Sequence, residues 1–170
     1  LISEIMKNTN NNELINDCCP VFEPDRWDDK MLDWNKKPFI MATVPADNHV
    51  PDTSKIQEAV TQMMKLATDA NALAPDMLDT LMLFMGPSPS QSNIYLSVTK
   101  NVPNANNVTL SGEFKTHVQQ GNYENVGHMI NQMNADLADH KIAVKNIYAH
   151  YAYCPQCEAS VGHNYTTLFA

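Results

Sequence analysis

The stretch Val108-Thr-Leu-Ser-Gly-Glu-Phe-Lys-Thr-His-Val118, with the residues that follow it, decides how this chain is expected to fold. Within it apolar and polar side chains alternate, which is the pattern of a half-buried β-strand. Gly121 then breaks the strand, and from Tyr123 the apolar residues recur with helical spacing. The helical stripe consists of Tyr123, Val126, Met129, Ile130, Met133 and Leu137. A strand that leads directly into an amphipathic helix is therefore predicted here.

Two strand-like runs, 146–153 and 164–170, come after this helix, and the same order of elements occurs once before. In the first half we expect a strand at Phe39–Val44, running into Pro45, and a helix from Ser54 with the capping box Ser54-Lys-Ile-Gln57. A hairpin of 81–85 and 93–100 follows. The two helix starts lie about 69 residues apart. Since the halves share almost no identity, the repeat is one of element order.

The sequence thus predicts an α+β fold, a pseudo-twofold duplicated β-α-β-β. Its strands are expected to form a single antiparallel sheet with two helices on one face. The repeats span about 38–100 and 108–170, so the domain is 38–170. Residues 1–37 are expected to form an N-terminal extended segment that docks on the domain through Trp27 and Trp34. The junction of the repeats is the natural place for a ligand groove.

Composition excludes several classes of partner. The net charge of −8 argues against binding to nucleic acid or to an anionic membrane surface, since both need clustered Lys and Arg. No run reaches the roughly 20 apolar residues of a membrane span. The start of the chain lacks the apolar core of a signal peptide. We therefore expect a cytoplasmic protein, monomeric or homodimeric, with a small molecule as its partner, and no nucleic acid or membrane.

The cysteines offer the sharpest chemistry, in two pairs: Cys18-Cys19 and Cys154-Pro-Gln-Cys157. Interpreted as a turn between two strands, the second pair is a zinc knuckle, and the first pair would complete a tetrahedral zinc site. Adjacent cysteines in an extended chain point opposite ways, so His163 is a possible replacement ligand. A disulfide, a redox dithiol and reduced thiols remain alternatives. The redox dithiol is disfavoured because no helix N-terminus is expected at this turn.

Acids, histidines and aromatic residues supply the other candidates. Glu113 lies on the polar face of the central strand, and His150 belongs to an aromatic-rich strand, so both are candidate catalytic residues. Each also has a plainer interpretation as a surface or packing residue. The candidate ligand-binding residues are Tyr95, Glu113, Tyr148, His150 and Trp34. No serine-hydrolase elbow, phosphate loop or dinucleotide fingerprint is present in the sequence.

The sequence resembles the gyrase-inhibitor-like (GyrI-like) small-molecule-binding domain family, in which a strand ends in Gly-x-Tyr and a helix begins. The resemblance is carried by Thr109-Leu-Ser-Gly112, which runs into Val118-Gln-Gln-Gly121-Asn-Tyr123. Further segments look like a group of bacterial homologues often labelled hydrolase: Cys18-Cys-Pro-x-Phe, Ile94-Tyr-Leu-Ser-Val-Thr-Lys, Val102-Pro-Asn-Ala-Asn-Asn and Tyr153-Cys-Pro-x-Cys157. The resemblance implies an effector-binding-domain fold over about 38–170. It also implies bulky, often aromatic ligands in the groove between the halves, which some members hydrolyse.

Three functions follow as expectations. The first is binding of a bulky apolar or aromatic small molecule in the groove, for sensing or sequestration. The second is a hydrolase on the same scaffold, with Glu113 or His150 activating water. The third is an acidic protein-interaction module, which the gyrase-inhibitor-like resemblance implies and for which Asp25, Asp28, Asp29 and Asp33 supply clustered charge. Zinc, in a structural role, is the one cofactor expected.

Overall fold

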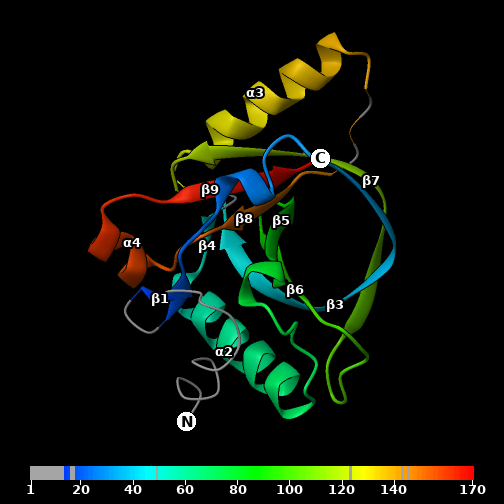
Figure 1. Cartoon of the computed structure of the whole chain (residues 1–170), viewed down its shortest axis with the longest axis vertical. Helices are drawn as coiled ribbons and strands as arrows, with labels where there is room; N and C mark the ends of the chain where they lie inside the picture. Colours follow the sequence, from blue (N-terminus) through cyan, green and yellow to red (C-terminus); the bar gives the residue numbers. More distant parts are fainter. Residues whose placement is uncertain (1–13, 16–17, 49, 123, 143, 145) are drawn as a thin grey trace. The chain divides into compact units, whose positions relative to one another are not determined.

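The structure is a computed structural model, and it describes residues 14–15, 18–48, 50–122, 124–142, 144 and 146–170. They divide into two compact units, which Figure 1 colours along the chain. Unit 1 holds the described residues up to Leu32 together with Phe114–Ala170, and unit 2 holds Asp33–Glu113. Both contain helices and antiparallel strands, so the predicted α+β class is confirmed.

The elements follow the chain in this order: β1 (Leu14–Ile15), β2 (Cys19–Pro20), the 3-10 turn η1 (Pro24–Arg26), β3 (Met31–Asp47), β4 (Val50–Pro51), α2 (Thr53–Asp69), η2 (Met77–Asp79), β5 (Met82–Ser88), β6 (Gln91–Ser97), β7 (Asn107–Gln120), α3 (Val126–Asp139), β8 (Tyr148–Tyr151), α4 (Pro155–Val161) and β9 (Tyr165–Phe169). The predicted strands and the two predicted long helices all appear. Tyr123, the first residue of the predicted helical stripe, lies outside the described residues.

Unit 2 is built on antiparallel strands in the order β4-β3-β6-β5. The register pairs Ile40 of β3 with Leu96 of β6, and Leu96 in turn with Met82 of β5. Helix α2 packs on this sheet through Met63 and Ala67, which are buried against the strands. The core of unit 2 therefore lies between one helix and one face of its sheet.

Strand β3 is longer than the predicted Phe39–Val44. It begins at Met31, so Trp34 lies inside a strand. Prolines are tolerated in a strand where no amide donor is needed. Here the carbonyls of Pro38 and Pro45 still accept hydrogen bonds, from the amides of Val98 at 3.2 Å and Asp52 at 3.1 Å. The two prolines thus remove two backbone amide donors from β3, but the strand continues through both of them.

The N-cap of α2 is Asp52, so the predicted capping box starting at Ser54 is wrong. The carboxylate of Asp52 accepts from the amides of Ser54 at 3.0 Å and Lys55 at 3.4 Å, and from the Ser54 hydroxyl at 2.7 Å. These hydrogen bonds, that from Ser54 above all, lower the pKa of the Asp52 carboxyl. Asp52 precedes Ser54 and reaches the same free amides at the start of the helix, which is why it takes the cap.

We expect Asp52→Ala to destabilise the protein at neutral pH, since the first amides of α2 lose their acceptor. The pKa of Asp52 is lower in the folded state than its ordinary 3.8, so its contribution is complete above that value and disappears as the pH falls through the folded-state pKa. Thermal unfolding of both proteins at neutral and acid pH measures this. The difference should close at acid pH. A difference that persists in acid would contradict the assignment.

In unit 1 the strand order is β7-β9-β8, with β9 antiparallel to both neighbours. Thr116 of β7 pairs with Phe169, and Tyr148 of β8 pairs with the same residue. Helix α3 packs on this sheet through residues of its predicted stripe, and Figure 1 shows it running along the sheet. The buried core consists of Met129, Met133, Leu137, Ala149 and Leu168. The central strand of unit 1 is thus its C-terminal strand.

Gly121 separates β7 from α3, as the sequence predicts. Its φ of +143° is a conformation that side chains rarely adopt, and an added Cβ would lie 2.6 Å from Cε of Met129. Its carbonyl accepts from the hydroxyl of Thr166 at 2.9 Å, and its amide donates to the carbonyl of Asn164 at 2.9 Å. A residue with no side chain is required where the strand turns so closely beneath the helix.

Units 1 and 2 share an order of elements and of strands: strand, helix, then a pair whose last strand lies in the middle. The long helices also end alike. Asn71 and Lys141 take left-handed conformations, and the amides of Ala72 and Ile142 return to the carbonyls of Ala67 and Leu137. These equivalent residues lie about 70 positions apart, close to the predicted offset. The pseudo-twofold arrangement about a shared sheet stays a prediction.

One element was not expected. Residues 155–161 form the short helix α4 inside the β8–β9 connection, where the sequence analysis predicted only a turn. Pro155 occupies the first helical turn, and Gly162 takes the left-handed conformation at its end, with φ of +80°. Proline at a helix start and glycine after its end are the standard signals of a helix. The Cys-Pro-Gln-Cys segment is therefore a helix N-terminus and not a knuckle turn.

Candidate functional site

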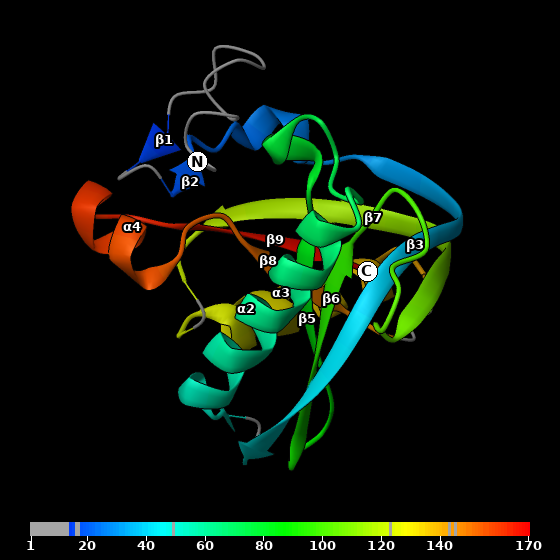
Figure 2. The same cartoon turned by 90° about the horizontal axis from the view of Figure 1, so that it is seen from below.

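All four cysteines of the chain meet in unit 1. Cys18 and Cys19 belong to the β1–β2 hairpin, whereas Cys154 and Cys157 lie at the start of α4. Both views show the hairpin beside α4 (Figures 1 and 2). The four Sγ atoms all lie within 4.8 Å of one another. Segments that are 136 residues apart in sequence therefore contribute to one cluster, as predicted for a metal site.

The spacing of the thiols fits a tetrahedral metal site. Sγ of Cys18 lies 3.7 Å from Sγ of Cys154 and 3.8 Å from Sγ of Cys19. Zinc binds thiolates at about 2.3 Å, so the sulfurs of a regular tetrahedron are about 3.8 Å apart. A disulfide would need about 2.05 Å, and all four cysteines are free here. The donor set and its size therefore fit zinc, although no metal is part of the structure.

The adjacent cysteines meet because Cys18 lies in a turn and not in an extended strand. The amide of Cys18 donates to the carbonyl of Ile15 at 3.0 Å, which closes the turn just before β2. The side chains of Cys18 and Cys19 then need not alternate, as neighbours on a strand do. The geometric objection that favoured His163 as a replacement ligand is thus removed.

Backbone amides around α4 point at the sulfurs. The side chain of Cys154 is the N-cap of the helix, and its Sγ accepts from the amide of Cys157 at 3.5 Å. The amide of Cys154 donates to Sγ of Cys19 at 3.4 Å. Such donors offset part of the negative charge that thiolates bring together. The start of α4 is therefore arranged to hold sulfur anions.

The thiols differ in their ease of deprotonation. Burial, reinforced by the neighbouring Cys154 side chain, raises the pKa of Cys18 to about 11, and burial also raises the pKa of Cys19. Burial opposes ionisation of Cys154 as well, but hydrogen bonds from the Cys157 amide and the surrounding thiols outweigh it and lower its pKa. Cys154 is thus the one of these three thiols whose pKa its surroundings lower. The expectation that no helix N-terminus acts on this pair is wrong.

The cluster fastens what we call the N-terminal arm, the described residues from Leu14 to Lys30. The amide of Phe22 donates to the buried hydroxyl of Tyr153 at 3.0 Å, and the Phe22 ring lies 5.3 Å from that of Tyr165. The ring of Trp27 packs on Phe169 at 5.9 Å. This ring contact agrees with the predicted docking of Trp27, which stays a prediction.

His163, the predicted replacement ligand, is not among the grouped side chains. Its Nδ1 lies 3.2 Å from the carbonyl oxygen of Val161. Its ring packs at 6.1 Å from Tyr153 and 5.5 Å from Tyr165. Within the described chain, His163 therefore lies in the aromatic packing beside the cluster and is not one of its four ligating groups.

The other predicted site residues fall in both units. In unit 2, Trp34 and Tyr95 contact the same ring, that of Phe39, at 5.7 and 6.3 Å, and Glu113 is exposed on β7. In unit 1, Tyr148 is buried with its ring 6.1 Å from that of Phe114. His150 is half-buried on β8, opposite Thr167 of β9. Their joint role in one groove stays a prediction.

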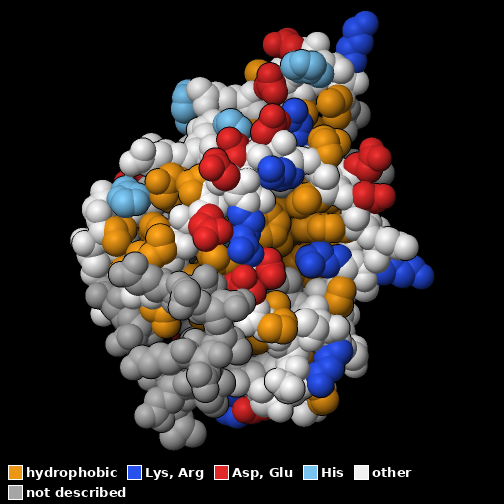
Figure 3. All heavy atoms as spheres, viewed as in Figure 1, with side chains coloured by type: hydrophobic (Ala, Val, Ile, Leu, Met, Phe, Trp, Pro, Cys, Tyr) orange, Lys and Arg blue, Asp and Glu red, His pale blue; other side chains and the backbone are white. Residues whose placement is uncertain are grey.

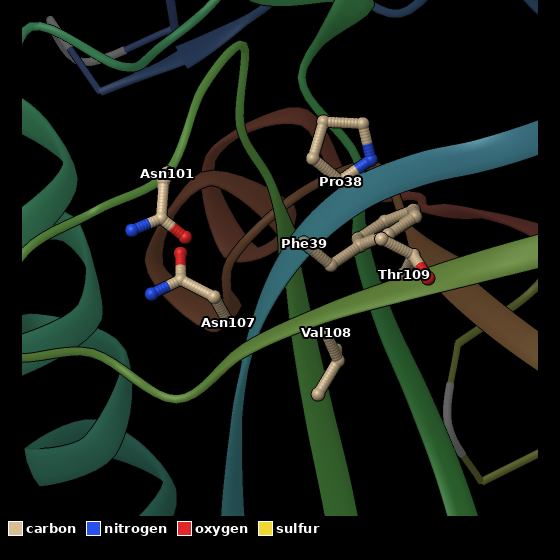
Figure 4. A pocket seen from close by; sticks show the side chains of 6 residues that line it. All are labelled: Pro38, Phe39, Asn101, Asn107, Val108 and Thr109. Atoms are coloured by element: carbon tan, nitrogen blue, oxygen red, sulfur yellow. The ribbon is translucent and has the colours of Figure 1, made fainter.

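Unit 2 has a pocket of its own, with a volume of about 640 Å³. Figure 4 shows the six side chains that line it: Pro38, Phe39, Asn101, Asn107, Val108 and Thr109. The amide group of Asn107 is fixed by hydrogen bonds to the amide and carbonyl of Val102 and to the carbonyl of Ala105. The sequence analysis missed Phe39 and Asn107 as lining residues, since the Asn-rich linker predicts only a loop.

Two of the acidic residues near the N-terminus lie beside basic side chains. Asp29 lies 3.4 Å from the ammonium of Lys115, and Asp28 lies 3.4 Å from Nδ1 of His117. On the face drawn in Figure 3, acidic side chains lie among Lys and Arg side chains. No helix of the described residues is long and apolar enough to cross a membrane.

Comparison with known proteins identifies a family. The model of a family described as Bacterial hydrolase matches residues 7–170, whereas no curated protein matches the chain. The name of that family agrees with the hydrolase group in the predicted resemblance, and the finer GyrI-like resemblance stays a prediction. Since the match takes in nearly the whole sequence, this chain belongs to the Bacterial hydrolase family.

Proposed function

We propose that this chain is a zinc-stabilised hydrolase in which the four cysteines hold one structural zinc ion. The observation that carries the zinc assignment is the meeting of four Sγ atoms within 4.8 Å. Soft thiolate ligands in a tetrahedron select zinc over magnesium or calcium. Four protein ligands leave no open position for water, which is the arrangement of structural and not of catalytic zinc sites. Hydrolysis, which the family name supports, then takes place elsewhere in the chain.

Zinc in this cluster would join the N-terminal arm to α4. It would add metal–sulfur bonds to the contacts that Phe22 and Trp27 already make, and so fix residues that precede the first long strand. Cys157 is fully buried, so its sulfur would face the metal out of reach of water. Because a site of this kind exists only in the folded chain, its binding free energy contributes to folding.

Native mass spectrometry of the purified protein with and without a chelator tests this assignment. We expect the intact mass to carry one zinc ion, and to lose it on chelation. Cys154→Ser should bind no zinc tightly, whereas Gln156→Ala, an exposed residue between the two helix cysteines, should retain it. Wild-type protein with four reduced thiols and no metal after expression in zinc-supplemented medium would refute the zinc site.

A second proposed function, favoured by the pocket of unit 2, is binding of a bulky apolar or aromatic small molecule. Its volume of about 640 Å³ is within the range of ligand sites. Phe39 and Val108 supply apolar contact, and Oδ1 of Asn107, held in place by the Val102 amide, has a second lone pair that could accept a hydrogen bond from a ligand. The six lining residues include no acid or histidine, so this pocket is suited to binding a ligand and not to activating water. Glu113 and His150 stay the proposed catalytic residues.

The neutral dye Nile red is a suitable first ligand for this pocket. We expect Val108→Glu to weaken dye binding by about tenfold or more, because a carboxylate would enter an apolar wall. Val50→Glu places the same charge at a residue that is 66% exposed and lies outside the lining, and should bind as the wild type does. Fluorescence titration measures both affinities. Equal weakening by the two substitutions would show that the dye binds elsewhere.

The pseudo-twofold GyrI-like fold and a cytoplasmic location complete the proposal. The shared strand order of units 1 and 2, and the matching ends of α2 and α3, support a duplicated unit. Four reduced cysteines support a reducing compartment, because secreted proteins tend to form disulfides. A monomer or homodimer that binds neither nucleic acid nor membrane remains the proposed state, and the same native mass spectra report the stoichiometry.

A further inference from the structure

The four thiols of the cluster are not equally open to solvent. Cys18 is exposed, Cys19 and Cys154 are half-buried, and Cys157 is fully buried. Sγ of Cys157 also lies 3.4 Å from the carbonyl oxygen of Ile15, to which it donates. A reagent that approaches from solvent therefore meets Cys18 first, and Cys157 last.

The pair best placed to form a bond joins the two segments. Sγ of Cys18 is 3.7 Å from Sγ of Cys154, so a further approach of less than 2 Å gives the S–S distance of a disulfide, about 2.05 Å. Cys18 and Cys19 are adjacent in sequence, and their disulfide would require a strained ring that includes the peptide bond between them. Cys154 is therefore the partner that geometry offers to Cys18.

We propose that the cluster is an oxidation site for hydroperoxides, at which Cys18 and Cys154 form a disulfide. This inference rests on the proposed zinc site, whose ligands it consumes. As a ligand of the proposed zinc ion, Cys18 would be held as a thiolate. Its sulfur attacks the outer peroxide oxygen and the O–O bond breaks, which gives a sulfenic acid and, with one proton, water or an alcohol. The thiolate of Cys154 then attacks the sulfur of Cys18, and hydroxide leaves as water after taking one proton.

The oxidised cluster keeps the N-terminal arm attached. A zinc ion held by the four thiolates would lose two of its ligands and would be released. The new bond links residue 18 to residue 154, the two segments that the proposed zinc ion would join. A disulfide between Cys154 and Cys157 would instead leave the arm without a covalent link. Under oxidising conditions the Cys18–Cys154 disulfide would thus replace the zinc–sulfur bonds as the link between the N-terminal arm and α4.

Stoichiometric hydrogen peroxide, added to the purified full-length protein, tests this proposal. Before the addition, native mass spectrometry records whether zinc is bound, which decides the proposed zinc site independently. After it, a colorimetric zinc indicator follows metal release, and tandem mass spectrometry of non-reduced peptides maps the disulfide. We expect release of one zinc ion per chain, a crosslink between Cys18 and Cys154, and full reversal by dithiothreitol. Cys157→Ser should still form the crosslink, because Cys157 is not part of the pair.

Three results would overturn the proposal. They are a disulfide between Cys154 and Cys157, a disulfide between Cys18 and Cys19, and oxidation of Cys18 to sulfinic acid without any crosslink. Each can be recorded whether or not zinc was present at the start, so failure of this inference is distinct from failure of the zinc site. Protein that holds no zinc before the addition of peroxide would refute the zinc site, on which this inference rests, whereas zinc-loaded protein that forms no Cys18–Cys154 crosslink would refute this inference alone.

Discussion

Chelation of zinc is expected to lower the midpoint of thermal unfolding of the wild-type protein by about 10 °C. Structural zinc binds small peptides with about 10–16 kcal/mol, and even a third of the lower figure, about 3 kcal/mol, would be lost from folding. In a chain of this length each kcal/mol corresponds to about 2–4 °C. The loss arises because the arm, with Phe22 and Trp27, is then held only by its packing and hydrogen bonds.

Differential scanning calorimetry with and without chelator measures this shift. Cys154→Ser should unfold at the lower temperature in both conditions, since it has already lost the metal. Gln156→Ala should respond to the chelator as the wild type does. A wild-type midpoint that chelation leaves unchanged would show that the cluster contributes nothing to stability through a metal.

Phe169→Ala in β9 is expected to destabilise the protein by about 3–5 kcal/mol, the usual cost of deleting a buried phenylalanine ring. Phe169 is fully buried, pairs with both β7 and β8, and carries the ring on which Trp27 packs. Its removal leaves a cavity under the arm. Urea unfolding measures the change, and Ile142→Ala, at a residue 50% exposed, should cost less than about 0.5 kcal/mol. Similar costs for the two variants would contradict this account of the core.

The local elements of the fold follow from periodicity, since each element carries its own pattern. The stripe of α3 and the alternation of β7 are both visible in the sequence, and part of each is buried: Met129, Met133 and Leu137 of α3, and Phe114 and Thr116 of β7. Where two neighbouring residues could both cap a helix, the sequence alone does not show which of them does. Asp52 and Ser54 are both good capping residues, and only the backbone path shows that Asp52 reaches the free amides.

The start of β3 shows a different limit. Pro38 and the Trp34 region suggest an extended surface segment, whereas the pairing partners that make it a strand lie far away in sequence. One such contact is the amide of Lys36, which donates to the hydroxyl of Ser111 at 2.8 Å. Contacts between residues so far apart leave no local pattern that a sequence analysis can detect.

The candidate metal site was predictable in composition but not in geometry. Two cysteine pairs suggest zinc, and the structure brings all four together. That the second pair opens a helix was signalled by Pro155 and Gly162, a combination typical of helix ends that the turn interpretation overlooked. The turn at Cys18, which lets adjacent cysteines converge, has no such signal.

X-ray absorption at the zinc edge of the purified protein tests the central claim most directly. The account predicts four sulfur neighbours at about 2.3 Å and no nitrogen or oxygen in the first shell. The same spectrum of Gln156→Ala should be indistinguishable from that of the wild type. Nitrogen or oxygen ligands at about 2.0–2.2 Å, or fewer than four sulfurs, would contradict the all-cysteine clamp on the N-terminal arm.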